Sequence, residues 1–303
     1  MVKKKVLITG ATGFLGSSLL RRRELETQLY PTALKKGRDQ GVTIEGMDLT
    51  NFSEVNKVIK KVKPDIIYHL GAIVNLARDF QVAQKCIEIN IRGTLNLLEA
   101  LRNIKLERFI FANTEETYGE GPLPYHENQT VNPPSPYAVS KIAGEYFSKI
   151  YAKTFGFKLI SLRIGTMYGP GQLKDRFIPQ IIIRALKNED IPLTSGKKKR
   201  DYVYIDDVVD ALVLTKDVSL SGDFVIVNIG GGVSYTLREL VKRILEITGS
   251  KSKILFGKIA ERVLEADEWL MDIDQARQLL HWKPKTSLEE GIKKTAIYYK
   301  NFV

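Results

Sequence analysis

Short apolar runs alternate with amphipathic segments of helical length through the first half of the chain. The runs are rich in β-branched residues and predict strands at residues 6–9, 30–34, 42–45, 66–69, 109–112 and 159–163. The spacing of apolar positions between them predicts helices at residues 14–25, 52–62, 82–103 and 140–155. This alternation indicates an α/β fold, with a doubly wound parallel sheet covered by helices on both faces.

The second half has a different pattern. Proline and glycine cluster between residues 169 and 196, a strand is predicted at 224–229, and helical periodicity returns at 237–248 and 274–280. We therefore expect a sheet domain of residues 1–165 and 202–229. The remaining residues, 166–201 and 230–303, are expected to form a smaller, discontinuous α/β lobe.

Composition excludes several classes of protein. A chain of 303 residues with 44% hydrophobic and 27% charged residues is typical of a globular protein and not of a disordered or fibrous one. No apolar stretch approaches the roughly 18 residues that span a bilayer, and no signal peptide is recognisable, so a cytoplasmic protein without a membrane partner is expected. Because Cys86 is the only cysteine and there are three histidines, neither a disulfide nor a metal site is expected.

The formal net charge of +11 raises the possibility of nucleic-acid binding. The basic residues, however, form separate clusters at residues 3–5, 21–23 and 197–200, without interleaved aromatic residues. We therefore expect no nucleic-acid partner. A basic cleft for an anionic small molecule, such as a nucleotide, suits this distribution equally well.

A glycine-rich turn joins the first predicted strand to the first predicted helix. Glycines at such a turn let a ligand approach the backbone closely, and the N-terminus of the helix attracts a pyrophosphate. The turn therefore predicts a dinucleotide-binding loop, formed by Gly10, Thr12, Gly13, Phe14, Leu15 and Gly16.

Tyr137 and Lys141 are four residues apart in a predicted helix, which places both on one face. A phenol with a pKa of about 10 is a poor acid or base at neutral pH. A neighbouring ammonium and the positive charge of a nicotinamide would favour the phenolate and lower that pKa. This spacing alone also occurs by chance, and the catalytic role of the pair is what the family resemblance given next implies.

Together these motifs resemble the extended short-chain dehydrogenase/reductases, the NAD(P)-dependent nucleotide-sugar epimerase/dehydratase family, along nearly the whole chain. The resemblance implies a Rossmann-type sheet. Lys141 would also hold the nicotinamide ribose, and further cofactor contacts would come from Asp48, Leu49, Leu70, Gly71, Ala72 and Asn90. His69, which precedes this strand-end motif, is interpreted as a packed strand residue and not as a catalyst.

The same resemblance gives roles to two residues after the strand at 109–112. Thr114 matches the family's hydroxyl residue beside the catalytic tyrosine, where it binds the reacting oxygen. Glu116 matches a glutamate of the family's 4,6-dehydratases and of one group of decarboxylases, which removes the proton α to a ketone. A polar residue at a strand end remains the alternative for Glu116.

The loop after the second predicted strand bears on the choice of cofactor. An acidic residue there would bind the adenosine ribose, but the sequence offers Lys35, Lys36 and Arg38. These cations could pair with a 2′-phosphate, so NADP is preferred over NAD; the alternative is that they simply face solvent.

The substrate lobe contains residues that resemble the family's contacts to a nucleotide-diphosphate sugar. Arg200 and Arg262 would clamp the diphosphate, and Leu193 precedes Arg200 in the same signature. Thr166 stands where the family usually has an asparagine that contacts the phosphates.

The resemblance implies an oxidoreductase that moves a hydride between NAD(P) and a sugar carbon, usually C4. The C-terminal third resembles the 4-ketoreductases of the CDP-paratose and CDP-abequose synthase type, which favours an NADPH-dependent reductase. Glu116 favours a 4,6-dehydratase, and a 4-epimerase with retained NAD also stays open. The non-enzyme alternative, a dinucleotide-sensing scaffold, is disfavoured because Tyr137 and Lys141 are both present. A homodimer is expected through residues 90–101 and 143–151.

Overall fold

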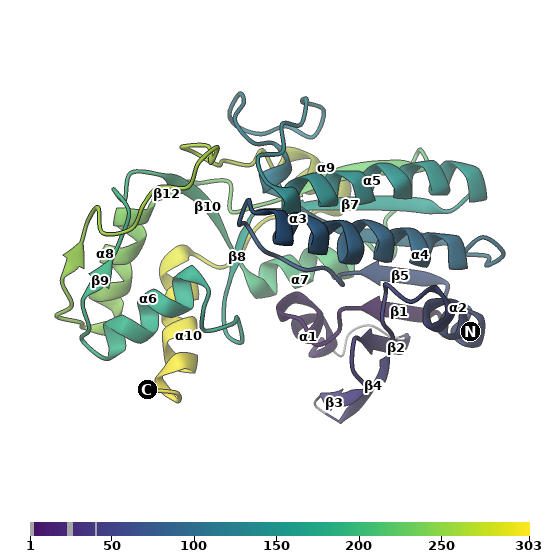
Figure 1. Ribbon diagram of the computed structural model, residues 1–303, viewed down its shortest axis with the longest axis horizontal. Helices are drawn as coiled ribbons and strands as arrows, with labels where there is room; N and C mark the ends of the chain where they lie inside the picture. The colour runs from purple at the N-terminus through teal and green to yellow at the C-terminus, as the bar shows by residue number, and fades with distance from the viewer. Residues whose placement is uncertain (1–2, 23–26, 40) are drawn as a thin grey trace.

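An eight-stranded sheet forms the larger half of the computed structural model, which describes residues 3–22, 27–39 and 41–303 (Figure 1). Its strand order is β11-β7-β6-β5-β1-β2-β4-β3. Neighbouring strands pair in parallel except β3 and β4, which are antiparallel. The strands are β1 (Lys5–Thr9), β2 (Gln28–Ala33), β3 (Gly37–Asp39), β4 (Val42–Gly46), β5 (Ile66–His69), β6 (Arg108–Thr114), β7 (Lys158–Ile164) and β11 (Phe224–Ile229).

Helices cover both faces of this sheet, which confirms the predicted α/β fold. In β1, Leu7 packs into one apolar cluster, and Val6 and Ile8 pack into another on the opposite face. All three are fully buried. Burial on both faces explains why the strands read as continuous apolar runs.

Helix α4 contacts both α2 and α5 on one side, and α1 contacts α7 on the other. Their bounds are α1 (Phe14–Leu20), α2 (Phe52–Val62), α4 (Gly93–Ala100), α5 (Pro136–Phe155) and α7 (Ile205–Leu214). Helix α1 ends at Leu20, whereas its helix was expected to end at residue 25, and residues 23–25 of that expectation lie outside the described part of the chain.

The long helix expected at residues 82–103 is divided into three segments. An α-helix, α3 (Phe80–Lys85), continues into a π-helix, η1 (Cys86–Arg92), and then into α4. Asn90 lies in the π-helical turn, where its side chain bonds both the N–H and the C=O of Ile73, at 2.8 and 3.1 Å. The wider turn thus lets one helix residue hold the loop that follows β5.

The second half of the chain builds two small sheets, with strand orders β12-β10-β8 and β13-β9. Helices α6, α8 and α10 contact one another beside them and lie together at one end of the molecule (Figure 1). The elements are β8 (Thr166–Tyr168), β9 (Ile191–Pro192), β10 (Lys199–Tyr204), β12 (Ser234–Thr236), β13 (Ile254–Leu255), α6 (Phe177–Leu186), α8 (Leu237–Thr248), α9 (Asp274–Leu280) and α10 (Leu288–Lys300).

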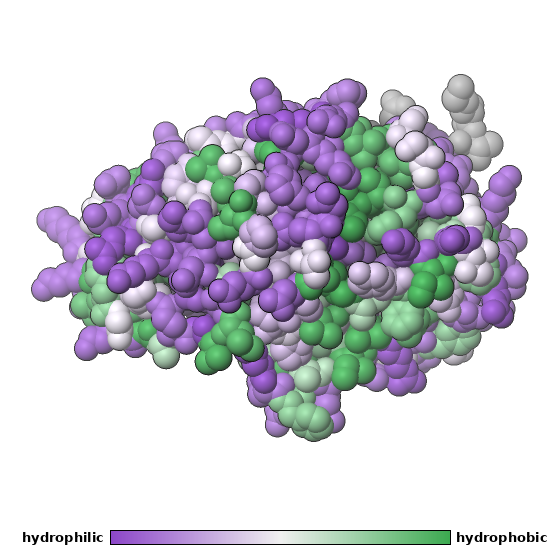
Figure 2. Space-filling view, turned by 90° about the horizontal axis from the view of Figure 1, so that it is seen from above, coloured by the Kyte–Doolittle hydropathy of each residue, from purple (hydrophilic) through white to green (hydrophobic). Residues whose placement is uncertain are grey.

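The expected helices at 52–62, 237–248 and 274–280 coincide with α2, α8 and α9. The expected division of the chain between residues 201 and 202 falls inside β10, so the domain boundaries stay a prediction. Within the described ranges, no helix is long and apolar enough to cross a membrane. Figure 2 shows apolar residues gathered more densely over the half that holds the large sheet than over the end that carries α6 and α8.

Candidate active site

The glycine-rich loop lies at the carboxyl end of β1 and packs directly against the end of β5. Gly10 has a φ of +69°, and a Cβ atom there would lie 2.6 Å from the Cα of Gly71. Gly13 precedes α1 and offers no side chain to cap its first turn, and Gly16 lies against the carbonyl of Gly10. This close, side-chain-free cradle fits the pyrophosphate of a dinucleotide. Thr12 is exposed at its rim, whereas Phe14 and Leu15 turn into the core.

A hydrogen-bond chain holds the end of β5 in place. The Thr94 hydroxyl donates to the carbonyl of Asn90 at 2.6 Å, so it accepts from His69 Nε2 at 2.9 Å. His69 Nδ1 then accepts from the Thr9 hydroxyl at 2.7 Å, and that oxygen accepts from Gly71 N–H at 3.0 Å. Burial lowers the pKa of His69 to about 3. His69 is 1% exposed at the end of β5, which confirms its interpretation as a packed strand residue.

The residues expected around the adenosine lie on the neighbouring strand ends. Leu49 contacts the cradle, since its Cδ1 would be 2.9 Å from a Cβ on Gly71. Asp48 accepts hydrogen bonds from the backbone N–H and the hydroxyl of Thr50, at 2.9 and 2.8 Å. The two predicted cofactor contacts beside Gly71, Leu70 and Ala72, are partly buried. The cations expected at a 2′-phosphate are exposed: Lys35, Lys36 and Arg38.

Tyr137 and Lys141 lie in the first two turns of α5, with only 7% and 4% of their surface exposed. Ser135 caps this helix by accepting from Ala138 N–H at 3.1 Å. The Lys141 amine lies 4.2 Å from the centre of the Phe111 ring. Burial lowers the pKa of Lys141 to about 7. The predicted pair is thus brought to one buried face.

Burial, and next the nearby Glu116 carboxylate, raise the pKa of Tyr137 above its ordinary value. A hydrogen bond with the Thr114 hydroxyl acts in the opposite direction. In the protein alone, desolvation therefore outweighs the effects that lower this pKa. The predicted lowering, which includes the charge of a bound nicotinamide, stays a prediction. The positive charge of a bound nicotinamide would have to lower the pKa of Tyr137 for the phenolate to form near neutral pH.

Two adjacent glutamates follow β6 in the short 3₁₀ turn η2 (Glu115–Thr117), and both are 2% exposed. Burial raises the pKa of Glu116 to about 6, while a hydrogen bond with Ser135 opposes the increase. Its Oε2 is buried and has no hydrogen-bond partner. This carboxyl can therefore exchange a proton near neutral pH beside Tyr137.

Sequence reasoning missed the other glutamate of this turn. Glu115 Oε1 accepts from the Thr166 hydroxyl at 2.6 Å, and burial raises the pKa of Glu115 well above its usual value. The only sequence signal was its position between Thr114 and Glu116. Thr166, expected to contact substrate phosphates, is thus bonded to a carboxyl of the protein.

A cleft of about 490 Å³ begins at Thr166, the partner of Glu115, and extends through the smaller half of the molecule. Its lining includes the four predicted substrate contacts, Thr166, Leu193, Arg200 and Arg262. The structure therefore brings together residues that are up to 96 positions apart in the chain, counted from Thr166 to Arg262.

One carboxylate joins two arginines of this cleft and a lysine next to it. Glu265 lies 3.1 Å from Arg200, 3.5 Å from Arg262 and 3.8 Å from Lys198. The Arg200 guanidinium also donates to three backbone carbonyls and lies 4.2 Å from the centre of the Trp269 ring. Arg200 is therefore already well bonded, whereas Arg262 is 56% exposed at the mouth of the cleft.

A second cavity, of about 590 Å³, adjoins the cleft and shares Arg262 with it. The two also share Arg176, and the lining of the second cavity adds Arg78; the sequence analysis singled out neither of these arginines. Arg78 lowers the pKa of Glu116, and Arg176 lowers that of Tyr137, each as a secondary effect. Two cationic side chains therefore lie near the catalytic residues: Arg78 in the loop after β5 and Arg176 at the start of α6.

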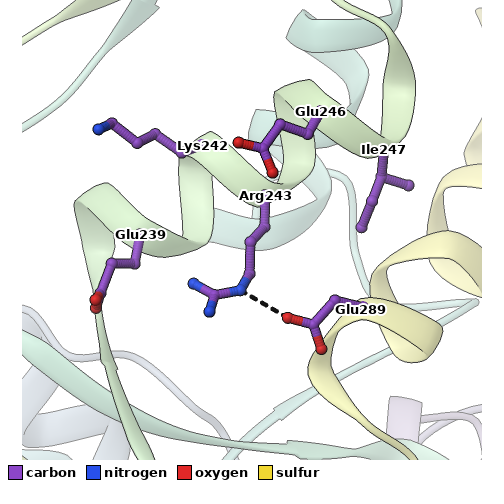
Figure 3. Close-up of a pocket in the computed structure, with 6 residues that line it drawn as sticks. All are labelled: Glu239, Lys242, Arg243, Glu246, Ile247 and Glu289. Carbon is purple, nitrogen blue, oxygen red and sulfur yellow. Dashed lines mark hydrogen bonds and ion pairs between the residues drawn. The ribbon is translucent and has the colours of Figure 1, made fainter.

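A separate surface hollow of about 330 Å³ lies between α8 and α10 (Figure 3). There Arg243 donates to Glu289 at 2.7 Å, and the other lining groups are mostly charged. None of the predicted site residues lines it.

Comparison with known proteins gives the family. Residues 6–230 match the NAD dependent epimerase/dehydratase family. The chain belongs to this family. An uncharacterized UDP-glucose epimerase, YtcB of Bacillus subtilis, is 32% identical over 97% of both chains. The dTDP-glucose 4,6-dehydratase of Salmonella typhimurium is 28% identical over 97% of this chain and 92% of its own length.

Solved structures agree over the whole chain. The UDP-glucose 4-epimerase of Thermus thermophilus, in complex with NAD, superposes with a TM-score of 0.89 at 28% identity, covering 99% of this chain and 100% of its own. MoeE5 with UDP-glucuronic acid and NAD gives a TM-score of 0.90 at 28% identity, with the same coverage. The chain is thus an NAD-dependent enzyme of nucleotide sugars and not a scaffold.

Two finer expectations receive no support. The relatives are epimerases and dehydratases and not CDP-sugar reductases, so the expected resemblance of the C-terminal third to those reductases is not supported. The structural relatives were solved with NAD, so the preference for NADP that was based on Lys35, Lys36 and Arg38 is not supported either.

Proposed function

We propose that this protein is a nucleotide-diphosphate-sugar 4,6-dehydratase that retains NAD through each turnover. Glu116 is the observation that carries the proposal. It is a buried carboxyl beside Tyr137, with one oxygen free of partners and a pKa of about 6. Removal of a proton α to a ketone needs such a base, whereas hydride transfer at C4 alone does not.

NAD, when bound, would accept a hydride from the sugar and return it at a later step. The loop from Gly10 to Gly16 and the backbone at Gly71 would hold it, because the cradle leaves room for a pyrophosphate. Lys35, Lys36 and Arg38 then act only as exposed surface cations.

The residues of the chain would move the protons. Tyr137 takes the proton of the C4 hydroxyl, and Thr114 hydrogen-bonds the same oxygen. Lys141 supplies positive charge beneath the phenol. Glu116 removes the proton from C5, next to the new ketone, and passes it to the C6 hydroxyl, which leaves as water. The returned hydride would then add at C6, and C5 would regain a proton.

The cleft supports a nucleoside diphosphate as the carrier of the sugar. Arg262 lies half-exposed at its mouth, and Arg200 is fixed deeper against Trp269. Two guanidiniums suit a diphosphate better than ammonium groups do, because each offers paired N–H donors.

A 4-epimerase is the second candidate, and the relative that is 32% identical favours it. An epimerase uses the same Tyr137 chemistry but gives an isomer of its substrate, without loss of water. Glu116 would then have no essential role.

Product analysis distinguishes the two. The purified protein is first extracted with acid to identify any bound dinucleotide, and is then incubated with UDP-glucose or dTDP-glucose. A dehydratase gives a product lighter by one water in mass spectrometry. With Glu116→Gln the reaction should stop after C4 oxidation and the absorbance of the reduced dinucleotide should persist, while the exposed control Glu120→Gln behaves as wild type. An isomeric product formed at full rate by Glu116→Gln would establish the epimerase.

We further propose a homodimer through the helices next to the active site. Large apolar side chains are exposed there, on α3, η1 and α5: Phe80 (75%), Ile87 (57%), Tyr146 (55%) and Ile150 (59%). Pairing of this face would remove them from water. A monomer in sedimentation equilibrium at micromolar concentration would contradict the proposal.

A further inference from the structure

A buried carboxylate, Glu145, lies two helical turns after Tyr137 and one turn after Lys141 on α5. It is 3% exposed, and nothing in the proposed chemistry uses it directly. An ionised group in such a place costs free energy unless it is fully bonded, so its surroundings indicate what it does.

The surroundings come from two neighbouring strands. Asn113 of β6 and Arg163 of β7 are register partners, as are Phe111 and Ser161 two residues earlier. Because side chains alternate along a strand, all four project to the same face of the sheet, where α5 packs. This face therefore presents one aromatic ring and three hydrogen-bond donors to the helix.

The donors converge on Glu145. Its Oε2 accepts from Asn113 Nδ2 at 2.7 Å and from Ser161 Oγ at 2.6 Å, and its Oε1 accepts from Arg163 Nη2 at 2.7 Å. Asn113 is bonded in turn to the next residue, since its Oδ1 accepts from the backbone N–H of Thr114 at 2.8 Å. The carboxylate is thus two hydrogen bonds away from the backbone of a candidate catalytic residue.

We propose that Glu145 is a positioning residue for both sides of the catalytic pair. Through Asn113 it fixes the backbone of Thr114, and from the adjacent helical turn it supplies the negative charge that keeps Lys141 an ammonium. The role rests on the proposed function of Tyr137 and Lys141, but the arrangement around Glu145 does not depend on which sugar is bound.

The charges around Lys141 agree with this role. Its amine packs on the uncharged Phe111 ring, and the neighbouring His69 is held neutral. Burial lowers the pKa of Lys141 to about 7, and Glu145 is the group that opposes this decrease. Arg163 is the other nearby charge and is ion-paired to Glu145, with its guanidinium also 4.8 Å from the centre of the Tyr118 ring. Without the Glu145 charge, the pKa of Lys141 falls further and the ammonium is lost at neutral pH.

The test measures Lys141 directly, so that it does not require turnover. Protein labelled with ¹³Cε-lysine is titrated by NMR, and the Lys141 signal is assigned from its absence in Lys141→Met. Glu145→Gln is combined with Arg163→Met, which avoids leaving a guanidinium buried without its partner. We expect the pKa of Lys141 to fall by about one unit, a tenfold loss in proton affinity. Ser161→Ala is the matched control, because it removes a bond to Glu145 and keeps both charges; its titration should match wild type.

Asn113→Ser tests the link to Thr114. This variant keeps Glu145 and Arg163 but loses the side chain that bonds the backbone N–H of Thr114, so kcat should fall about tenfold while NAD affinity and the Lys141 titration stay unchanged. An unshifted Lys141 titration in the double variant would overturn the proposal. So would unfolding of both the double variant and Asn113→Ser in circular dichroism, which would assign the cluster to stability alone. Absence of turnover in wild type would contradict the proposed function and leave the titration to decide the role of Glu145.

Discussion

The backbones of Gly10 and Gly71 are so close that a Cβ atom on Gly10 would lie 2.6 Å from the Cα of Gly71. Gly10 also has a φ of +69°, which disfavours any residue with a Cβ. We therefore expect Gly10→Ala to reduce the free energy of unfolding by about 1–3 kcal/mol, the cost of overpacking. Binding of NAD should weaken as well, because the loop must move. Urea unfolding and a fluorescence titration with NAD measure the two effects.

Gly37→Ala is the control for this substitution. A Cβ on Gly37 meets no heavy atom within 4 Å, and Gly37 lies in β3, away from the loop. Equal losses of stability and NAD binding in both variants would contradict the role of the Gly10–Gly71 contact.

His69 should make stability depend on pH. Its folded-state pKa is about 3, against an ordinary value of 6.5. The unfolded chain therefore binds more protons than the folded one between these values, and the free energy of unfolding falls as pH falls through this window. This one group changes the free energy of unfolding by up to about 1.4 kcal/mol per pH unit. Above pH 6.5 the imidazole is neutral in both the folded and the unfolded chain, so its protonation no longer affects stability. Urea unfolding at several pH values should show a shallower slope for His69→Gln; an unchanged slope would contradict the assignment.

The sequence predicted the large sheet well because burial on both faces leaves a local signal. Val6, Leu7 and Ile8 are apolar in succession, and the glycines after them mark the turn to α1. Tyr137 and Lys141 were recognisable for a similar reason, since their spacing matches one helical turn.

The smaller lobe left weaker signals. Strands β8 and β12 have three residues each, too few for a period to appear. Glu145 and Glu265 matter through contacts with residues from other elements, and no local pattern shows such contacts. The preference for NADP rested on cations whose exposure could not be known from the sequence. The π-helical turn at Asn90 was likewise hidden, because its apolar pattern is that of an ordinary helix.

Turnover should depend on the ionisation of Glu116. Burial raises the pKa of this carboxyl from 4.5 to about 6, and a base must be deprotonated to act. The rate of α-proton removal should therefore rise with pH up to about pH 6 and level off above it. Glu116→Gln should reduce kcat by about 10²–10⁴-fold, the usual contribution of a general base, without weakening NAD binding. The kcat of wild type and of the control Glu120→Gln is measured at pH values below and above 6. If kcat does not rise with pH up to about 6 in either protein, Glu116 is not the base.

Arg262 should carry much of the affinity for the nucleotide diphosphate. Its guanidinium is 56% exposed at the mouth of the cleft and 3.5 Å from Glu265, so a phosphate can reach it without unfolding the lobe. A hydrogen bond to a charged group contributes about 1.5–3 kcal/mol, and Arg262→Met should therefore weaken UDP binding by at least about tenfold. Arg243→Met is the matched control, because this arginine is ion-paired in the separate hollow between α8 and α10 (Figure 3). Isothermal titration with UDP should separate the two variants, and equal affinities would place the diphosphate away from Arg262.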